Sequence, residues 1–379
     1  MKLFEYEAKS LARNLGIPTP KGGVASSPDE AKDIHKRMGG EVVVKAQVLV
    51  AGRAKAGGVK FASKPDETRD RASEILGLVI KGEKVKKVLV EQKALAKKEI
   101  FLSIVQDRAN KCQTVLASDQ GGIDIEQVAR EHPEKIVRQR LDPIFGMRSF
   151  DARSVALKLG YAGPQLLSLA DLLSNLHRLS VIYDGELVES NPVIETQEGR
   201  FTTADLRLII DDNSLFRHPE FQERSREPSS EVTPLESKAR ERGLAFVELE
   251  GDIGIIGNGA GLVMATIDLV KQYGGNPANF CDVGGGANAD QVATALEIVQ
   301  SSERVRLVLI NILAGITRCD EVAKGIVEVK KVVGLRKPLV IRMVGTNQEE
   351  GRSILHSEGI SVLDGMDEAG KQAVLAGAG

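Results

Sequence analysis

The stretch IGIIGNGAGLVMATIDLVKQYGGNPANFCDVGGGA, residues 253–287, decides the fold of the second half of the chain. A short apolar run leads into a glycine turn and an amphipathic helical segment, and a second apolar run then leads into another glycine loop. Because this unit recurs to the end of the chain, it predicts an α/β fold with a doubly wound parallel sheet. We expect strands near residues 253–257, 279–283, 305–313, 338–344 and 360–363, and helices near residues 260–273, 288–302, 318–334, 347–357 and 366–377.

Glycine loops follow three of these expected strands, at residues 257–261, 283–287 and 313–317. Open parallel sheets bind ligands beyond the carboxyl ends of their strands, and free N–H groups at helix N-termini attract carboxylates and phosphates. Asn258 and Thr317 add side-chain donors to these loops. Glycines that only permit close packing explain any single loop equally well, but they explain three loops at one edge less well. The pattern favours an anion-binding edge.

The segment before this region, Phe221–Ser237, is polar, contains two prolines and lacks periodicity. We interpret it as a domain linker in preference to a long loop within one domain. The sequence before the linker is less regular. There we expect strands near residues 41–48, 59–61, 88–91 and 99–106, two β runs around a turn at residues 197–199, and helices near residues 3–15, 65–76 and 164–179.

Lys45 stands inside the apolar run EVVVKAQV, where burying an ammonium group is costly unless an anion neutralises it. The next loop, Gly52–Gly58, supplies Arg53, Lys55 and unhindered backbone N–H groups, which are the parts needed to hold a polyphosphate. The loop lacks the Walker A spacing. A lysine that reaches solvent at a strand end, beside a mobile hairpin tip, explains the pattern equally well.

A hairpin that turns at residues 197–199 places Asn191 opposite Asp205, on one face of the sheet. An amide oxygen and a carboxylate suit Mg²⁺, which in nucleotide sites takes one or two such ligands together with phosphates and water. Glu189 lies two residues from Asn191 and therefore on the same face. For an arbitrary hairpin a solvated polar face is the more common explanation.

Composition narrows the class of protein. The 379 residues include 51 Lys and Arg against 53 Asp and Glu, a net charge of −2, which argues against a dedicated nucleic-acid binder. No apolar run is long enough to span a membrane, and the N-terminus is unlike a targeting peptide, so we expect a cytoplasmic protein without a membrane partner. None of the five histidines lies in a glycine-rich loop, and the three cysteines are interpreted as packing residues.

Long, ordered motifs make the chain resemble the β subunits of succinate–CoA ligases, which belong to the ATP-grasp superfamily. They are LFEYEAKSL (3–11), VVVKAQVLVAGRAKAGGVK (42–60), VESNPVI (188–194), GNGAGLV (257–263) and NILAGITRCD (311–320). The resemblance implies an ATP-grasp domain over residues 1–230, with a small lid over about residues 20–100. It also implies a flavodoxin-like CoA-ligase domain over residues 238–379.

The resemblance also implies roles for individual residues. In the first domain they are nucleotide phosphate binding by Lys45, Gly52, Arg53 and Ala54, base and ribose contacts by Glu91, Ala94 and Glu99, Mg²⁺ binding by Asn191 and Asp205, and contact with a phosphohistidine by Glu189. In the second they are binding of the substrate carboxylate by Asn258, Gly315, Ile316 and Thr317, and a loop facing the phosphohistidine at Gly284, Gly285 and Gly286. Lys45 and Glu189 are the implied catalytic residues.

The reaction implied by the resemblance joins succinate to CoA with Mg²⁺-ATP (or GTP), and it belongs to the tricarboxylic acid cycle. The phosphorylated histidine and the CoA site belong to a separate α subunit, with which the chain forms a heterodimer or heterotetramer. A malate–CoA ligase, or another ADP-forming acyl-CoA ligase, is the alternative within the class. A non-catalytic nucleotide-binding subunit is disfavoured because Lys45, Glu189, Asn191 and Asp205 are all present. Ala54 departs from the family pattern by replacing a glycine.

Overall fold

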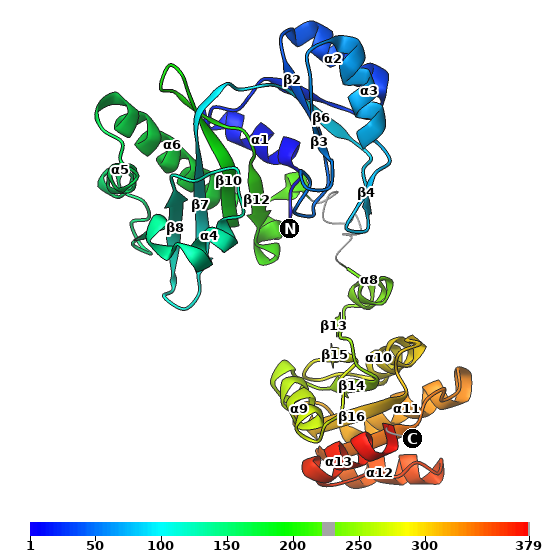
Figure 1. Ribbon diagram of the computed structural model, residues 1–379. Helices are drawn as coiled ribbons and strands as arrows, with labels where there is room; N and C mark the ends of the chain where they lie inside the picture. Colours follow the sequence, from blue (N-terminus) through cyan, green and yellow to red (C-terminus); the bar gives the residue numbers. More distant parts are fainter. Residues whose placement is uncertain (222–231, 378–379) are drawn as a thin grey trace. The chain divides into compact units, whose positions relative to one another are not determined.

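The computed structural model describes residues 1–221 and 232–377. The chain divides into two compact units, Met1–Ser230 and Glu231–Gly379 (Figure 1). Most of the segment that we interpret as a linker, residues 222–231, therefore lies outside the described residues. No helix in the described ranges is long and apolar enough to cross a membrane.

A four-stranded antiparallel sheet in the order β1-β6-β2-β3 forms the first layer of the first unit. Strand β2 is buried along its whole length, in agreement with its run of valines. Helices α2 and α3 pack against each other and cover one face of this sheet (Figure 1). The elements are β1 (Gly22–Ala25), α2 (Pro28–Met38), β2 (Val42–Ala46), β3 (Val59–Ala62), α3 (Pro65–Ile75), the small hairpin of β4 (Val79–Ile80) and β5 (Glu83–Lys84), and β6 (Val88–Gln92).

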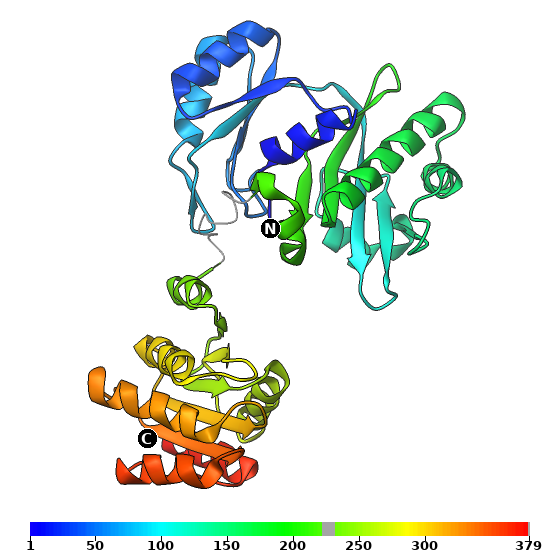
Figure 2. The same ribbon diagram turned by 180° about the vertical axis from the view of Figure 1, so that it is seen from behind.

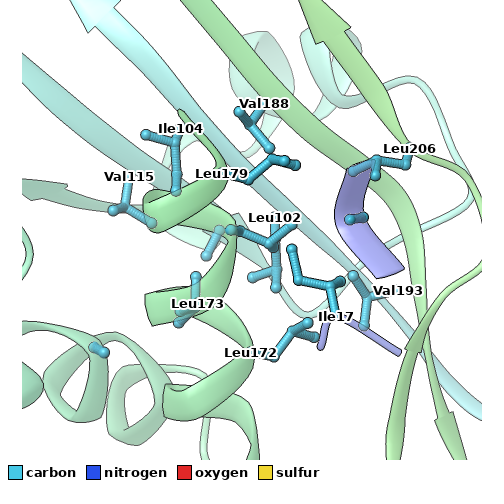
Figure 3. Close-up of a cluster of buried hydrophobic side chains, with 14 of the residues drawn as sticks. Ile17, Leu102, Ile104, Val115, Leu172, Leu173, Leu179, Val188, Val193 and Leu206 are labelled. Atoms are coloured by element: carbon cyan, nitrogen blue, oxygen red, sulfur yellow. The ribbon is translucent and has the colours of Figure 1, made fainter. Parts of the chain in front are cut away.

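A second antiparallel sheet, in the order β11-β10-β7-β8-β9 with β12 also beside β10, carries the larger of the two core clusters of the first unit. The long apolar helix α6 packs across it, and Leu172, Leu173 and Leu179 of this helix meet Leu102 and Val188 of the strands (Figure 3). The elements are β7 (Ala96–Asp107), β8 (Cys112–Ser118), α4 (Ile125–Glu131), β9 (Val137–Arg140), α5 (Ser149–Lys158), α6 (Gly163–Ile182), β10 (Gly185–Thr196), β11 (Phe201–Thr203) and β12 (Arg207–Ile210).

The predicted hairpin has the expected register, although its returning arm is broken into two strands. Val193 pairs with Thr203 in β11, and Glu189 pairs with Arg207 in β12. Both pairs centre on residue 198, as the turn at Gln197–Gly199 predicted. Asp205 lies in the break between β11 and β12, so the pair expected between Asn191 and Asp205 is not among the paired residues of these strands.

The second unit is a sheet in the order β13-β15-β14-β16-β17, parallel except for the edge strand β13. Its parallel strands follow the flavodoxin-like order. Helices α9 and α13 pack on one face and α10, α11 and α12 on the other (Figures 1 and 2). The elements are α8 (Pro234–Glu241), β13 (Ala245–Glu248), β14 (Ile253–Gly257), α9 (Ala260–Gln272), β15 (Asn279–Asp282), α10 (Ala289–Ser301), β16 (Leu307–Ala314), α11 (Cys319–Val332), β17 (Leu339–Gly345), α12 (Gln348–Ser357) and α13 (Met366–Gly377).

One local prediction for this unit was wrong, and two of its elements were not predicted. The strand expected at residues 360–363 is only an isolated bridge between Leu363 and Arg342. None of those four residues is buried, so a longer ladder would cover little apolar surface there. Edge strand β13 was not predicted. Helix α8, which begins inside the predicted linker with a capping box at Thr233, was also missed.

Candidate active site

The Lys45 ammonium group belongs to a buried cluster of charges and does not reach solvent at the end of its strand. Its Nζ lies 2.9 Å from Glu5 Oε1 and 3.0 Å from Glu91 Oε2, and it donates to the Ala204 carbonyl. Burial by itself lowers the pKa of a lysine, but the two carboxylates outweigh burial and raise the pKa of Lys45. The group therefore keeps the positive charge that a phosphate ligand requires.

A second ammonium group uses the same oxygen atoms. Lys9, on α1 (Glu5–Asn14), lies 2.8 Å from Glu5 Oε1, 2.6 Å from Glu91 Oε2 and 2.7 Å from the Ala204 carbonyl oxygen. The side chains of Lys9 and Glu91 are both 0% exposed. Burial raises the pKa of Glu5, but Lys45, Lys9 and Arg53 outweigh it and hold that pKa well below its usual range.

Neither Glu5 nor Lys9 was predicted to have a role in the site. The available signal was their spacing of four residues in a predicted helix, which usually indicates a weak ion pair on a helix surface. Helix α1 instead buries this pair, because Lys9 reaches Glu91 on β6 and the Ala204 carbonyl between β11 and β12. The helix thus links the charges of the two sheets of the first unit.

Arg53 connects the loop after β2 to the predicted metal ligand Asp205. Its guanidinium group makes a bidentate pair with the Asp205 carboxylate, at 2.9 and 2.8 Å, and a bond of 2.8 Å to Glu5 Oε2. Three cations and three carboxylates are therefore in contact, so the cluster has no net formal charge. Its members are Lys9, Lys45, Arg53, Glu5, Glu91 and Asp205.

The loop around Arg53 accommodates Ala54 at the position where the family pattern has a glycine. Gly52 has a φ of +91°, a conformation that favours glycine, whereas Ala54 is not among the residues with positive φ. The loop closes on itself, since the Gly58 N–H donates to the Arg53 carbonyl at 2.8 Å. Gly52 and Ala54 are both exposed. The alanine therefore causes no backbone strain at that position.

Asn191 and Glu189 lie on the neighbouring strand β10. The Asn191 Oδ1 accepts a bond of 2.7 Å from the Gly122 N–H, and its Nδ2 donates to the Ile123 carbonyl at 3.0 Å. Burial raises the pKa of Glu189; Arg207 acts against that shift, and Asp205 adds to it. A partly buried carboxylate with a raised pKa is a candidate functional group.

The residues implied to contact the base and ribose lie in different surroundings. Glu91 directs its carboxylate into the charge cluster, Ala94 is half-buried between β6 and β7, and Glu99 is exposed on β7. A Cβ at Gly122 would lie 2.1 Å from Glu99 Oε2. Gly122 also has a φ of +71°. This glycine therefore lets the loop after β8 approach both Glu99 and Asn191, a role that the sequence did not reveal.

The glycine loops of the second unit meet at one edge of its sheet. Asn258 Nδ2 donates to Thr317 Oγ1 at 3.1 Å, and the Gly286 N–H donates to the same Oγ1 at 3.0 Å. Asp282, which was not predicted as a site residue, accepts from the N–H groups of Gly259 and Gly284 at 2.6 and 2.7 Å. These bonds join all three loops.

The tip of the last loop and the middle of the glycine loop stay accessible. Gly315, Ile316 and Gly285 are exposed, and Ile316 is 87% exposed. Thr317 is buried behind them. The structure therefore brings together the residues that the resemblance assigned to substrate binding, with backbone N–H groups at the surface and the side chains of Asn258 and Thr317 bracing the loops.

Two of the three cysteines pack in the interior, whereas Cys112 is half-buried. Cys281 and Cys319 are buried, and burial raises the pKa of the Cys281 thiol to about 12. A thiol with so high a pKa is a poor nucleophile. His35, the histidine of α2, is likewise buried and bonded to Thr68.

The fold and these two sites define a class of protein: an ATP-grasp enzyme joined to a CoA-ligase domain. Residues 2–195 match the family model for the ATP-grasp domain, and residues 256–375 match the model for CoA-ligase. The chain belongs to the family of succinate–CoA ligase (ADP-forming) β subunits. It is 44% identical over 374 residues to that subunit of Staphylothermus marinus, covering 99% of this chain and 98% of the relative. With the subunit of Desulfurococcus amylolyticus it shares 47% over 370 residues, covering 97% of each chain.

A solved structure supports the fold independently. ATP citrate lyase from Methanothrix soehngenii, in complex with citrate and coenzyme A, superimposes with a TM-score of 0.71 over 99% of both chains. Its sequence identity to this chain is 19%, so the similarity concerns the arrangement of the two domains' elements and not the substrate.

Proposed function

We propose that this chain is the nucleotide- and acid-binding β subunit of a cytoplasmic succinate–CoA ligase. With an α subunit that carries the phosphohistidine and binds CoA, it converts ATP, succinate and CoA to ADP, phosphate and succinyl-CoA. The observation that carries the proposal is the charge cluster, in which Lys45 and Arg53 are held beside Asp205. Relatives that are about 45% identical over almost the whole chain are named as succinate–CoA ligase β subunits, which supports the same activity.

Lys45 and Arg53 are the groups that receive the nucleotide phosphates. Both cations pair with carboxylates. Phosphate oxygens, which are also negatively charged, would replace these carboxylates as acceptors, and the cations would stay in an environment that holds little water. The exposed N–H groups of Gly52 and Ala54 add neutral donors from the loop.

Asp205 and Asn191 fit Mg²⁺ as a carboxylate and an amide oxygen, the hard donors that this ion prefers. The Asp205 carboxylate pairs with a cation, the Arg53 guanidinium, and this pairing supports a role for Asp205 in binding positive charge. Bound Mg²⁺ would supply charge neutralisation for the phosphates. Arg53 must then release Asp205, and the phosphates provide its new partner.

In the second unit, the joined glycine loops hold the acid. Asn258, Gly315, Ile316 and Thr317 bind the succinate carboxylate, mainly through N–H groups at the loop tips, and Gly284, Gly285 and Gly286 face the phosphohistidine of the α subunit. The support for these roles is that one hydrogen-bonded set joins all three loops at the carboxyl edge of the sheet.

The proposal is tested by co-purifying the chain with an α subunit and measuring ADP release with Mg²⁺-ATP and CoA. Succinate, malate or no acid is supplied. We expect turnover with succinate, and none from either subunit alone. A preference for malate would correct the acid, since the two substrates differ by one hydroxyl group. A stable complex without turnover would contradict the catalytic function and support a regulatory nucleotide-binding subunit.

Glu189→Gln is expected to slow phosphorylation of the α-subunit histidine by about 10²-fold, because it removes the charge of a half-buried carboxylate that acts on the transferring group. The dissociation constant for ADP should change by less than about threefold, since Glu189 is not a nucleotide contact. Rapid-quench phosphoryl transfer and an ADP titration measure the two effects. Glu186→Gln, on the same strand in an exposed pair with Arg108, is the control. Equal losses in both measurements would argue against the role.

A further inference from the structure

Lys9 and Lys45 are bound to the same three oxygen atoms, Glu5 Oε1, Glu91 Oε2 and the Ala204 carbonyl. For Lys9 the distances are 2.8, 2.6 and 2.7 Å, and the contacts of Lys45 with the two carboxylates are 2.9 and 3.0 Å. The two cations are thus equivalent in their partners. They differ in their chain positions, because Lys45 is on the strand that leads into the Arg53 loop and Lys9 is on α1.

This duplication matters when Lys45 exchanges carboxylates for phosphate. Glu5 and Glu91 are buried, and a buried carboxylate without a cation is strongly destabilised. If Lys45 were the sole ammonium partner of Glu5 and Glu91, any movement of Lys45 toward a ligand would leave two buried carboxylates without an ammonium group. Lys9 is already in place on the same atoms, so the carboxylates stay paired.

The electrostatics of Lys9 agree with such an exchange. Burial lowers the pKa of Lys9; Glu5 raises it, and the nearby charge of Lys45 lowers it. Departure of Lys45 would remove that repulsion and leave Lys9 both carboxylates. Glu5 also holds Arg53 through its other oxygen, at 2.8 Å, so a neutralised Glu5 keeps the second phosphate-binding cation in position.

We propose that Lys9 is a positioning residue for nucleotide binding, which retains Glu5, Glu91 and the Ala204 carbonyl while Lys45 turns to the phosphates. The inference rests on the proposed function, because a polyphosphate is the ligand that draws Lys45 away. Lys9 itself does not touch the nucleotide.

The test is a calorimetric titration of the full chain with Mg²⁺-ADP. Lys9→Met should raise the dissociation constant about tenfold or more, because Lys45 is then the only ammonium group left for two buried carboxylates. The double variant Lys9→Met/Glu5→Gln restores the charge balance and should recover most of the affinity. Arg13→Met, on the same helix but at an exposed bond to Thr19, is the control and should bind as the parent does.

A merely structural Lys9 gives a different result: both variants melt at lower temperature, the double variant at least as low as the single one, and any folded protein binds ADP like the parent. That outcome would overturn the inference. A parent chain that does not bind ADP would contradict the proposed function itself, so the two failures are distinguishable.

A crystal structure of the parent chain with Mg²⁺-ADP tests the exchange without a variant. We expect Lys45 Nζ within hydrogen-bond distance of a phosphate oxygen, and Lys9 still bound to Glu5 and Glu91. Lys45 remaining on both carboxylates in the nucleotide complex would overturn the inference, even if Lys9→Met failed to fold.

Discussion

Asp205→Ala is expected to lower the turnover of the assembled ligase by about 10³-fold, because it removes the carboxylate of the proposed Mg²⁺ site. It also removes the bidentate partner of Arg53, which then retains Glu5 and the Ala46 carbonyl. Assembly with the α subunit should persist, since Asp205 lies in a short break between strands and is not a residue of the hydrophobic core. A coupled assay over a range of Mg²⁺ concentrations measures the effect.

The matched control for this variant is Asp142→Ala. Asp142 also accepts hydrogen bonds in the first unit, from the N–H groups of Ile144 and Phe145, but it lies outside the charge cluster. We expect it to keep normal turnover and a normal dependence on Mg²⁺. An Asp205→Ala enzyme with the parent's Mg²⁺ dependence would show that the metal is held elsewhere.

Lys45→Met is expected to slow phosphoryl transfer strongly and to destabilise the first unit. Phosphoryl transfer slows because one of the two cations proposed for the phosphates is removed while Arg53 remains; we expect a fall of about 10³-fold. Breaking a buried ion pair usually costs about 3–5 kcal/mol, but Lys9 remains on the same oxygens, so we expect about 2 kcal/mol. Urea unfolding of the chain and a single-turnover assay with the α subunit separate the two effects.

Lys36→Met is the control for Lys45→Met. Lys36 pairs with Asp33 on α2, where both side chains are more than half exposed, so its loss should change the free energy of unfolding by less than about 0.5 kcal/mol. Its turnover should stay normal. A Lys45→Met variant that still transfers phosphate at the parent's rate would remove Lys45 from the proposed mechanism.

The second unit was predicted well because its elements depend on local periodicity. Residues 253–257 form β14 as expected, and the predicted helices at 260–273 and 288–302 match α9 and α10 within two residues at each end. The segments that were predicted wrongly or missed lie at the edges of the sheet. Residues 360–363 are too exposed to extend the sheet, and β13 is a short edge strand whose pairing with β15 the local pattern does not indicate.

The candidate site was only partly predictable. The turn at residues 197–199 predicted the register that Glu189 and Arg207 show, because a hairpin's register follows from its turn. The expected pair of Asn191 and Asp205 falls where the returning arm is interrupted. The sequence also indicated that Lys45 needs an anionic partner, but it could not name one. The partners turned out to be Glu5 and Glu91, which are 40 and 46 residues away along the chain.

The sequence by itself determined the alternating strands and helices, the glycine loops at the strand ends and the hairpin register, since each follows from spacing along the chain. Only the tertiary structure decided which charges meet. Lys9 and Glu5 are ordinary helix residues until α1 is packed between the two sheets of the first unit, where they become buried partners of Lys45, Glu91 and Arg53. Burial and long-range contact set the strength of a charge pair, and neither can be inferred from the spacing of residues within a helix.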